Sequence, residues 1–90
     1  MLIKSFKVVA EEGVHARPAT LIVNKADKFD SEVCLSYMDK RINFKSIISV
    51  LSLGLFKGEL FSLRINGKDE EDAMQALTEL LIELKLAKEV

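Results

Sequence analysis

Apolar and polar residues alternate along the first part of the chain, which is the pattern of a strand that buries one face. Leu2, Phe6 and Val8 lie on that face, and the polar segment 11–13 ends the alternation. From Ala16 onward the apolar residues recur at helical spacing, which predicts an amphipathic helix. The residues of its apolar stripe are Ala19, Ile22, Val23, Ala26 and Phe29. A first strand therefore leads through a short turn into a first helix.

The alternation returns in the middle of the chain and predicts two further strands, over residues 33–37 and 42–44. The turn between them, 38–40, lacks the Asn-Gly pair that is typical of a tight hairpin, so its geometry stays open. A short apolar segment of helical period follows over residues 46–53. Gly54 closes it, in the position where helices often end on glycine.

The last third of the chain predicts one more strand and the longest helix. Phe61, Leu63 and Ile65 alternate with other residues and form the fourth strand. The helix begins after Asp69, a good N-cap residue, and the carboxylates at 70–72 suit the positive end of its dipole. The residues expected on its buried face are Ala73, Met74, Leu77, Leu80, Leu81 and Leu84.

The elements follow one another in the order β-α-β-β-α-β-α. This order favours an α+β fold, a two-layer open-faced sandwich in which three helices cover one face of a four-stranded antiparallel sheet. The 90 residues fit a single domain, residues 1–90, because no repeat, linker or low-complexity stretch divides them.

Charge and composition exclude several classes of protein. The net charge of −1 argues against a general binder of nucleic acid or of membrane surfaces, which needs a basic stripe. One His and one Cys cannot form a structural zinc site, so no metal and no other cofactor is expected. The N-terminal segment is neither a signal peptide nor a membrane span, and the lone Cys34 suits a reducing compartment. We therefore expect a cytoplasmic protein, and a monomer.

The segment between the first strand and the first helix carries the candidate chemistry. Gly13 allows a tight turn, and His15 then lies at or next to the helix N-cap, beside N–H groups without an intrahelical partner. These donors and the helix dipole form an anion site, and their field favours a neutral, nucleophilic imidazole. Arg17 can reach the same anion with a planar set of donors, and Pro18 stiffens the first turn. This arrangement leaves two uses open, reversible binding of an anion and covalent transfer of a phosphoryl group.

Residues 13–20, Gly-Val-His-Ala-Arg-Pro-Ala-Thr, resemble the active-site signature of the HPr family, the histidine-containing phosphocarriers of the phosphoenolpyruvate-dependent sugar phosphotransferase system. Residues 45–54 resemble the second signature of that family, in its Gram-positive type. The resemblance implies that phospho-enzyme I phosphorylates His15 on Nδ1. It also implies that Arg17 assists and that the group passes to IIA domains or subunits of sugar transporters. A carrier of this kind needs little catalytic machinery of its own, so the chain is not expected to be a stand-alone enzyme.

Ser46 has two interpretations. As the N-cap of a short helix it would contribute about 1 kcal/mol to stability. The resemblance implies a second role, phosphorylation by an ATP-dependent HPr kinase/phosphorylase, after which the protein acts as corepressor with a catabolite control protein. A phosphate there adds about two negative charges, which should weaken association with an acidic surface of enzyme I.

A partner-binding surface is expected beside His15. The short helix is apolar on too many faces for all of its side chains to be buried, and an exposed apolar patch marks a partner site. The residues that the resemblance implies for this surface are Ala16, Thr20, Leu21, Asn24, Ile47, Ile48 and Leu51. Ile48, Ser49, Leu51 and Phe56 depart from the family's usual residues, which puts the range of partners in doubt.

Two rival hypotheses accompany the carrier. One is a specialised regulatory member of the family that acts mainly through Ser46. Regulatory paralogues of the Crh type lack the active-site histidine, whereas this chain has His15. The other is a small α+β module that binds a free anion at the His15 helix end, without a covalent bond and in a salt-sensitive way.

Overall fold

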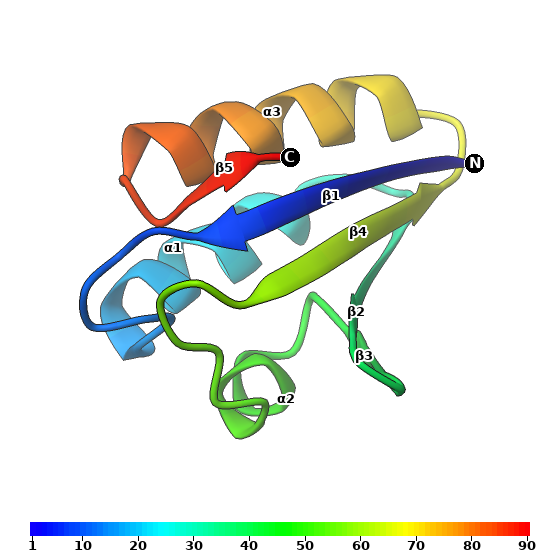
Figure 1. Ribbon diagram of the computed structural model, residues 1–90. Helices are drawn as coiled ribbons and strands as arrows, with labels where there is room; N and C mark the ends of the chain where they lie inside the picture. Colours follow the sequence, from blue (N-terminus) through cyan, green and yellow to red (C-terminus); the bar gives the residue numbers. More distant parts are fainter.

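The computed structural model describes residues 1–90 as one antiparallel sheet with helices packed on one face (Figure 1). The helices are α1 (Ala16–Ala26), α2 (Ile47–Ser52) and α3 (Glu70–Glu83). The strands are β1 (Leu2–Val8), β2 (Glu32–Tyr37), β3 (Lys40–Asn43), β4 (Leu60–Asn66) and β5 (Ala87–Glu89). The α+β open-faced sandwich expected from the element order is confirmed.

The sheet has the strand order β3-β2-β4-β1-β5, and every neighbouring pair is antiparallel. β4 lies between β1 and β2, and it pairs with β1 from Leu60 to Ile65. The sheet has five strands, so the expectation of four was wrong by one short edge strand. β5 was not predicted because it has three residues, two of them charged and exposed, which are too few to show an alternation of apolar and polar positions.

β5 reaches the sheet edge because α3 ends in a sharp turn. Lys85 follows the helix with a left-handed φ of +54°. The N–H of Lys85 donates to Ile82 O at 2.9 Å, and the N–H of Leu86 donates to Leu81 O at 3.0 Å. This pair of bonds is the Schellman motif that ends many helices, here with lysine in the place that glycine usually takes.

The core lies between the sheet and the helices. Phe6, Leu63 and Ile65 are fully buried on the inner face of the sheet, as their alternation predicts. The stripe of α1 is buried as expected, except that Phe29 lies beyond the end of the helix and is half-buried. On α3 the buried residues are Ala73, Met74, Leu77, Thr78 and Leu81. Leu80 and Leu84 are half-buried at the margin of that face, so the predicted stripe was too wide on one side.

Two local features complete the fold. Tyr37 pairs with Lys40, so β2 and β3 are joined by a two-residue turn in which Met38 takes a left-handed φ of +56°. The hairpin is therefore tight although the Asn-Gly pair is absent. None of the three helices is long and apolar enough to cross a membrane.

Candidate functional site

The loop between β1 and α1 is held in place from both sides. Near its start, the N–H of Val9 donates to Leu86 O at 2.8 Å, which ties the loop to the turn between α3 and β5. Near its end, the N–H of Val14 donates to Leu55 O at 2.9 Å, which ties it to the segment after α2. Glu11 and Lys57 of that segment also form an ion pair, but both side chains are exposed, so the pair adds little to the two backbone bonds. The loop that carries His15 is therefore fixed against two parts of the chain that are distant in sequence.

Gly13 is required by its contacts as well as by its backbone. Its φ of +68° is in the left-handed region, as the tight turn predicts. A Cβ at this position would lie 2.4 Å from Leu55 O, far inside van der Waals contact. Any side chain here would push the loop away from the segment that holds it.

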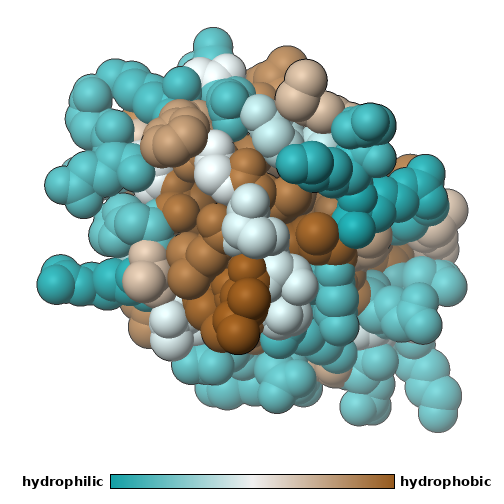
Figure 2. Space-filling model, turned by 90° about the horizontal axis from the view of Figure 1, so that it is seen from below, coloured by the Kyte–Doolittle hydropathy of each residue, from teal (hydrophilic) through white to brown (hydrophobic).

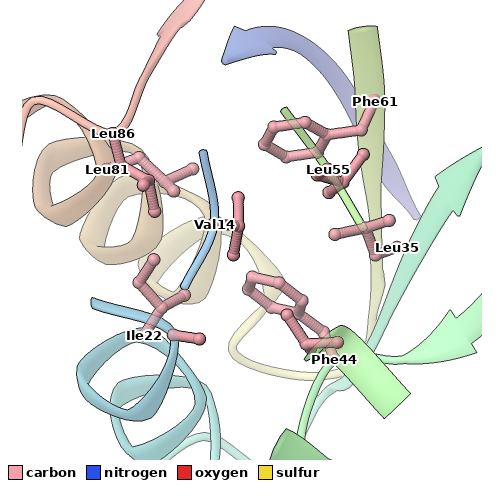
Figure 3. A pocket seen from close by; sticks show the side chains of 10 residues that line it. Val14, Ile22, Leu35, Phe44, Leu55, Phe61, Leu81 and Leu86 are labelled. Carbon is pink, nitrogen blue, oxygen red and sulfur yellow. The ribbon is translucent and has the colours of Figure 1, made fainter. Parts of the chain in front are cut away.

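Val14 points inward and anchors the loop in the core (Figure 3). It borders a void of about 10 Å³ whose lining is entirely apolar. Ile22 of α1 and Leu86 beyond α3 lie on one side of this void, and Phe44 and Leu55 on the other. An apolar void of this size stays dry, so the side chain of Val14, the residue before His15, makes only apolar contacts there.

His15 is the N-cap residue of α1, as expected. Its backbone is extended, and its carbonyl accepts the first intrahelical bond, from the N–H of Ala19 at 3.1 Å. Its side chain makes no capping bond and is 45% exposed. The imidazole is therefore free for chemistry, next to the first N–H groups of a helix, which have no acceptor within it.

The other predicted residues of α1 lie on its solvent side. Ala16, Arg17, Thr20 and Asn24 are all exposed. Arg17 makes no ion pair, so its guanidinium is available to an anion near the helix N-terminus. The hydroxyl of Thr20 donates to Ala16 O at 2.8 Å, so it is already used within the helix.

Ser46 is the N-cap residue of α2, and its structural interpretation is confirmed. Its Oγ accepts a hydrogen bond from the N–H of Ser49 at 3.4 Å. The side chain is half-buried, and the helix it begins packs against α1. The two segments that the sequence singled out, 13–18 and 46–54, therefore belong to neighbouring elements.

An apolar patch covers the end of the molecule that α2 occupies, with polar residues around it (Figure 2). Ile48 is 78% exposed and Leu51 38%, while Leu21 of α1 is 49% exposed. Phe56, which follows α2, adds a side chain that is 64% exposed. Ile47 differs from the others because it is half-buried against the core. Leu21, Ile48 and Leu51 are therefore exposed, as a partner surface would require, and Phe56 is exposed as well.

One neighbour of His15 was not predicted. Glu12 Oε2 lies 3.4 Å from His15 Nε2. The three-residue spacing of these side chains was visible in the sequence, but only the turn at Gly13 brings them together. No cluster of three or more His, Cys, Asp or Glu side chains that could hold a metal ion is present.

Comparison with known proteins identifies relatives of this chain. The family model described as the PTS HPr component phosphorylation site matches residues 3–83. An HPr from Thermoanaerobacter tengcongensis is 40% identical, with a TM-score of 0.87 over 94% of each chain. A phosphocarrier HPr from Bacillus anthracis is 32% identical, with a TM-score of 0.81 over 88% of this chain and 94% of that one.

The histidine-containing phosphocarrier protein of a Mycoplasma is 29% identical. It superimposes with a TM-score of 0.92 over 94% of this chain and 97% of that one. The family model and these superpositions thus indicate one and the same family. The chain belongs to the HPr family.

Proposed function

We propose that this chain is a phosphocarrier that accepts a phosphoryl group on His15 Nδ1 and passes it to another protein. Membership of the HPr family supports a phosphocarrier role in the phosphotransferase system. The observation that carries the proposal is the state of the His15 side chain. It occupies a helix N-cap, makes no capping bond and is exposed.

The transfer itself requires little from the carrier. The lone pair on Nδ1 attacks phosphorus, a P–N bond forms, and the bond between phosphorus and its donor breaks. The donor keeps that electron pair. The N–H groups at the start of α1 stabilise the negative oxygens, and Arg17 adds charge-assisted hydrogen bonds to them. Positioning and charge stabilisation are the main needs of phosphoryl transfer, and the partner proteins supply the rest.

The donor and the acceptors follow from the proposed role. Phospho-enzyme I would load His15, and IIA domains or subunits of sugar transporters would receive the group. The apolar patch of Leu21, Ile48, Leu51 and Phe56 is the proposed docking surface for both (Figure 2). Ala16, Thr20, Asn24 and Ile47 would line its borders. Patches of this kind, beside a reactive group, mark partner sites.

Ser46 is the proposed regulatory site, phosphorylated by an HPr kinase/phosphorylase in carbon catabolite control. The protein phosphorylated on Ser46 would then bind a catabolite control repressor. Ser46 begins the helix that carries Ile48 and Leu51, so a phosphate there would bring charge to the docking surface. A purely regulatory role of the Crh kind is not favoured, because this chain has His15, which regulatory paralogues of that type lack.

Phosphorylation by enzyme I and phosphoenolpyruvate tests the carrier role. We expect an acid-labile adduct of one phosphate by mass spectrometry, and none on His15→Ala. Arg17→Ala should lower kcat/KM at least about tenfold, because it removes charge-assisted hydrogen bonds to the phosphoryl oxygens. Absence of an adduct on the wild type, or an unchanged adduct on His15→Ala, would overturn the proposal. Salt-sensitive binding of free phosphate without an adduct would favour the anion-binding module instead.

The regulatory site is tested with two substitutions of Ser46. Incubation with HPr kinase and ATP should phosphorylate the wild type and leave Ser46→Ala unmodified. Ser46→Asp keeps an N-cap side chain and adds one negative charge, so it should slow phosphorylation of His15 by enzyme I. Ser46→Ala should lose about 1 kcal/mol of stability without that loss of rate. Equal rates for Ser46→Asp and the wild type would argue against regulation at the docking surface.

A further inference from the structure

Two consecutive carboxylates precede the reactive histidine, and they have different partners. Glu11 pairs with Lys57, on the segment that follows α2. Glu12 instead points its Oε2 at His15 Nε2, at 3.4 Å. Only Glu12 is thus directed at the imidazole. Glu11 carries the same charge one residue away, so a substitution of Glu11 is a matched control for a substitution of Glu12.

The contact with Glu12 distinguishes the two ring nitrogens. A neutral imidazole carries its proton on one nitrogen and a lone pair on the other. A carboxylate only accepts hydrogen bonds, so the nitrogen that faces Glu12 is favoured as the N–H. The lone pair is then on Nδ1. The imidazole is not committed to helix capping, so no capping bond competes for this arrangement.

We propose that Glu12 is a positioning residue for His15, which holds the Nε2–H tautomer and thereby presents Nδ1 as the nucleophile. The hydrogen bond that one ring nitrogen makes sets the state of the other, as in many functional histidines. This first part concerns the free protein alone and does not depend on the proposed function.

A second effect of Glu12 rests on the proposed function. When neutral His15 forms the P–N bond through Nδ1, the proton stays on Nε2 and the ring becomes positively charged. The donor leaves with the electron pair of its own bond to phosphorus. The carboxylate of Glu12 lies beside the nitrogen that keeps the proton, so it stabilises the charge that develops on the ring. Delivery of the group to an acceptor reverses these changes.

The first test uses nitrogen-15 NMR of His15 in the unphosphorylated protein, under conditions in which the ring is neutral. We expect Nε2–H to predominate in the wild type. Glu12→Ala should shift the tautomer ratio toward Nδ1–H by about threefold, the size of effect expected of one exposed charged contact. Glu11→Gln should leave the ratio unchanged, because its carboxylate faces Lys57. Equal ratios in Glu12→Ala and the wild type would overturn the proposal, whatever the protein does with phosphate.

The second test measures the rate at which enzyme I and phosphoenolpyruvate phosphorylate the intact chain. Glu12→Gln keeps an acceptor oxygen but removes the charge, and it should lower kcat/KM by about threefold to tenfold. Glu12→Ala should lower it at least as much, while Glu11→Gln should match the wild type. Thermal unfolding of each variant separates these effects from misfolding. A Glu12→Gln rate equal to that of the wild type would refute the charge effect. Absence of phosphorylation of the wild type would instead refute the carrier function and leave the tautomer result standing.

Discussion

Val14 links the surface chemistry of the loop to the core. Its N–H donates to Leu55 O, and its side chain enters the apolar void shown in Figure 3. His15 is the next residue, so the position of its imidazole depends on the packing of the Val14 side chain in the core. His15, as the proposed phosphorylation site, must be exposed to solvent, whereas Val14 must be packed in the core, and the turn at Gly13 allows both.

Substitution of Val14 tests this anchoring. Val14→Ala removes two methyl groups from the core and should lower the free energy of unfolding by about 1–2 kcal/mol. Val14→Ile adds one methylene group toward the void and should change stability by no more than about 0.8 kcal/mol, in the stabilising direction. Urea unfolding measures both. A Val14→Ile protein as unstable as Val14→Ala would mean that the void has no room for the added group.

Single residues were predictable from the sequence where their role is local. His15 and Ser46 are N-caps because of the residues immediately around them, and both were identified. Asp69 also occupies an N-cap position but makes no capping bond. Its carboxylate accepts hydrogen bonds from the N–H groups of Asp30 and Ser31 instead. Asp30 and Ser31 lie almost forty residues before Asp69. A pattern of neighbouring residues cannot indicate a contact over that separation, so this contact could not be predicted.

At the level of elements, the end of α3 shows how a strand can escape prediction. Helices that end in this way usually have glycine where Lys85 stands, and no such signal marked the stop. The long periodic elements, α1 and α3, were identified because burial imposes their pattern. β5 is held by backbone pairing with β1, from Phe6 opposite Glu89 to Val8 opposite Ala87, and this pairing needs no particular side chains.

The turn at Lys85 gives a test of this explanation. Lys85→Gly removes the cost of a left-handed backbone in a residue with a Cβ and should stabilise the protein by about 0.5–1 kcal/mol. For a chain of this size that corresponds to a rise in Tm of a few degrees. Lys85→Ala keeps the Cβ and should bring no such gain, so it is the matched control in thermal unfolding. A Tm for Lys85→Gly at or below that of Lys85→Ala would contradict the assignment of strain to this residue.

For the whole molecule, the fold brings the candidate functional segments together at one end. The loop before α1, the start of α2 and the segment 54–58 meet there, joined by the Val14–Leu55 bond. Periodicity predicted the elements and their layering. The strand order, with β4 between β1 and β2, depends on pairing between distant parts of the chain, and so does the approach of these three segments. The resemblance of two separated motifs to one family indicated the site before any contact was visible.

The opposite end of the molecule is held by Asp69, and this contact makes stability depend on pH. The hydroxyl of Ser31, the N–H of Asp30 and the N–H of Ser31 all donate to the carboxylate, joining the start of β2 to the start of α3. These hydrogen bonds lower the pKa of Asp69 below its ordinary value of 3.8, and the bond from the Ser31 hydroxyl has the largest effect. The folded protein therefore holds the ionised form more strongly than the unfolded chain does.

This contribution to stability is complete above the pKa of the unfolded chain and is lost as the pH falls through the lower pKa of the folded state. Asp69→Asn should therefore be less stable than the wild type at neutral pH. The difference in free energy of unfolding between the two proteins should narrow on acidification below about pH 4, because the wild type then loses the same interactions.

Asp72→Asn is the control, since Asp72 lies exposed in the first turn of α3 without hydrogen bonds of this kind. Urea unfolding between about pH 2 and pH 7 measures the effect. A constant difference between Asp69→Asn and the wild type over this range would show that the ionised carboxylate is not what joins these two elements.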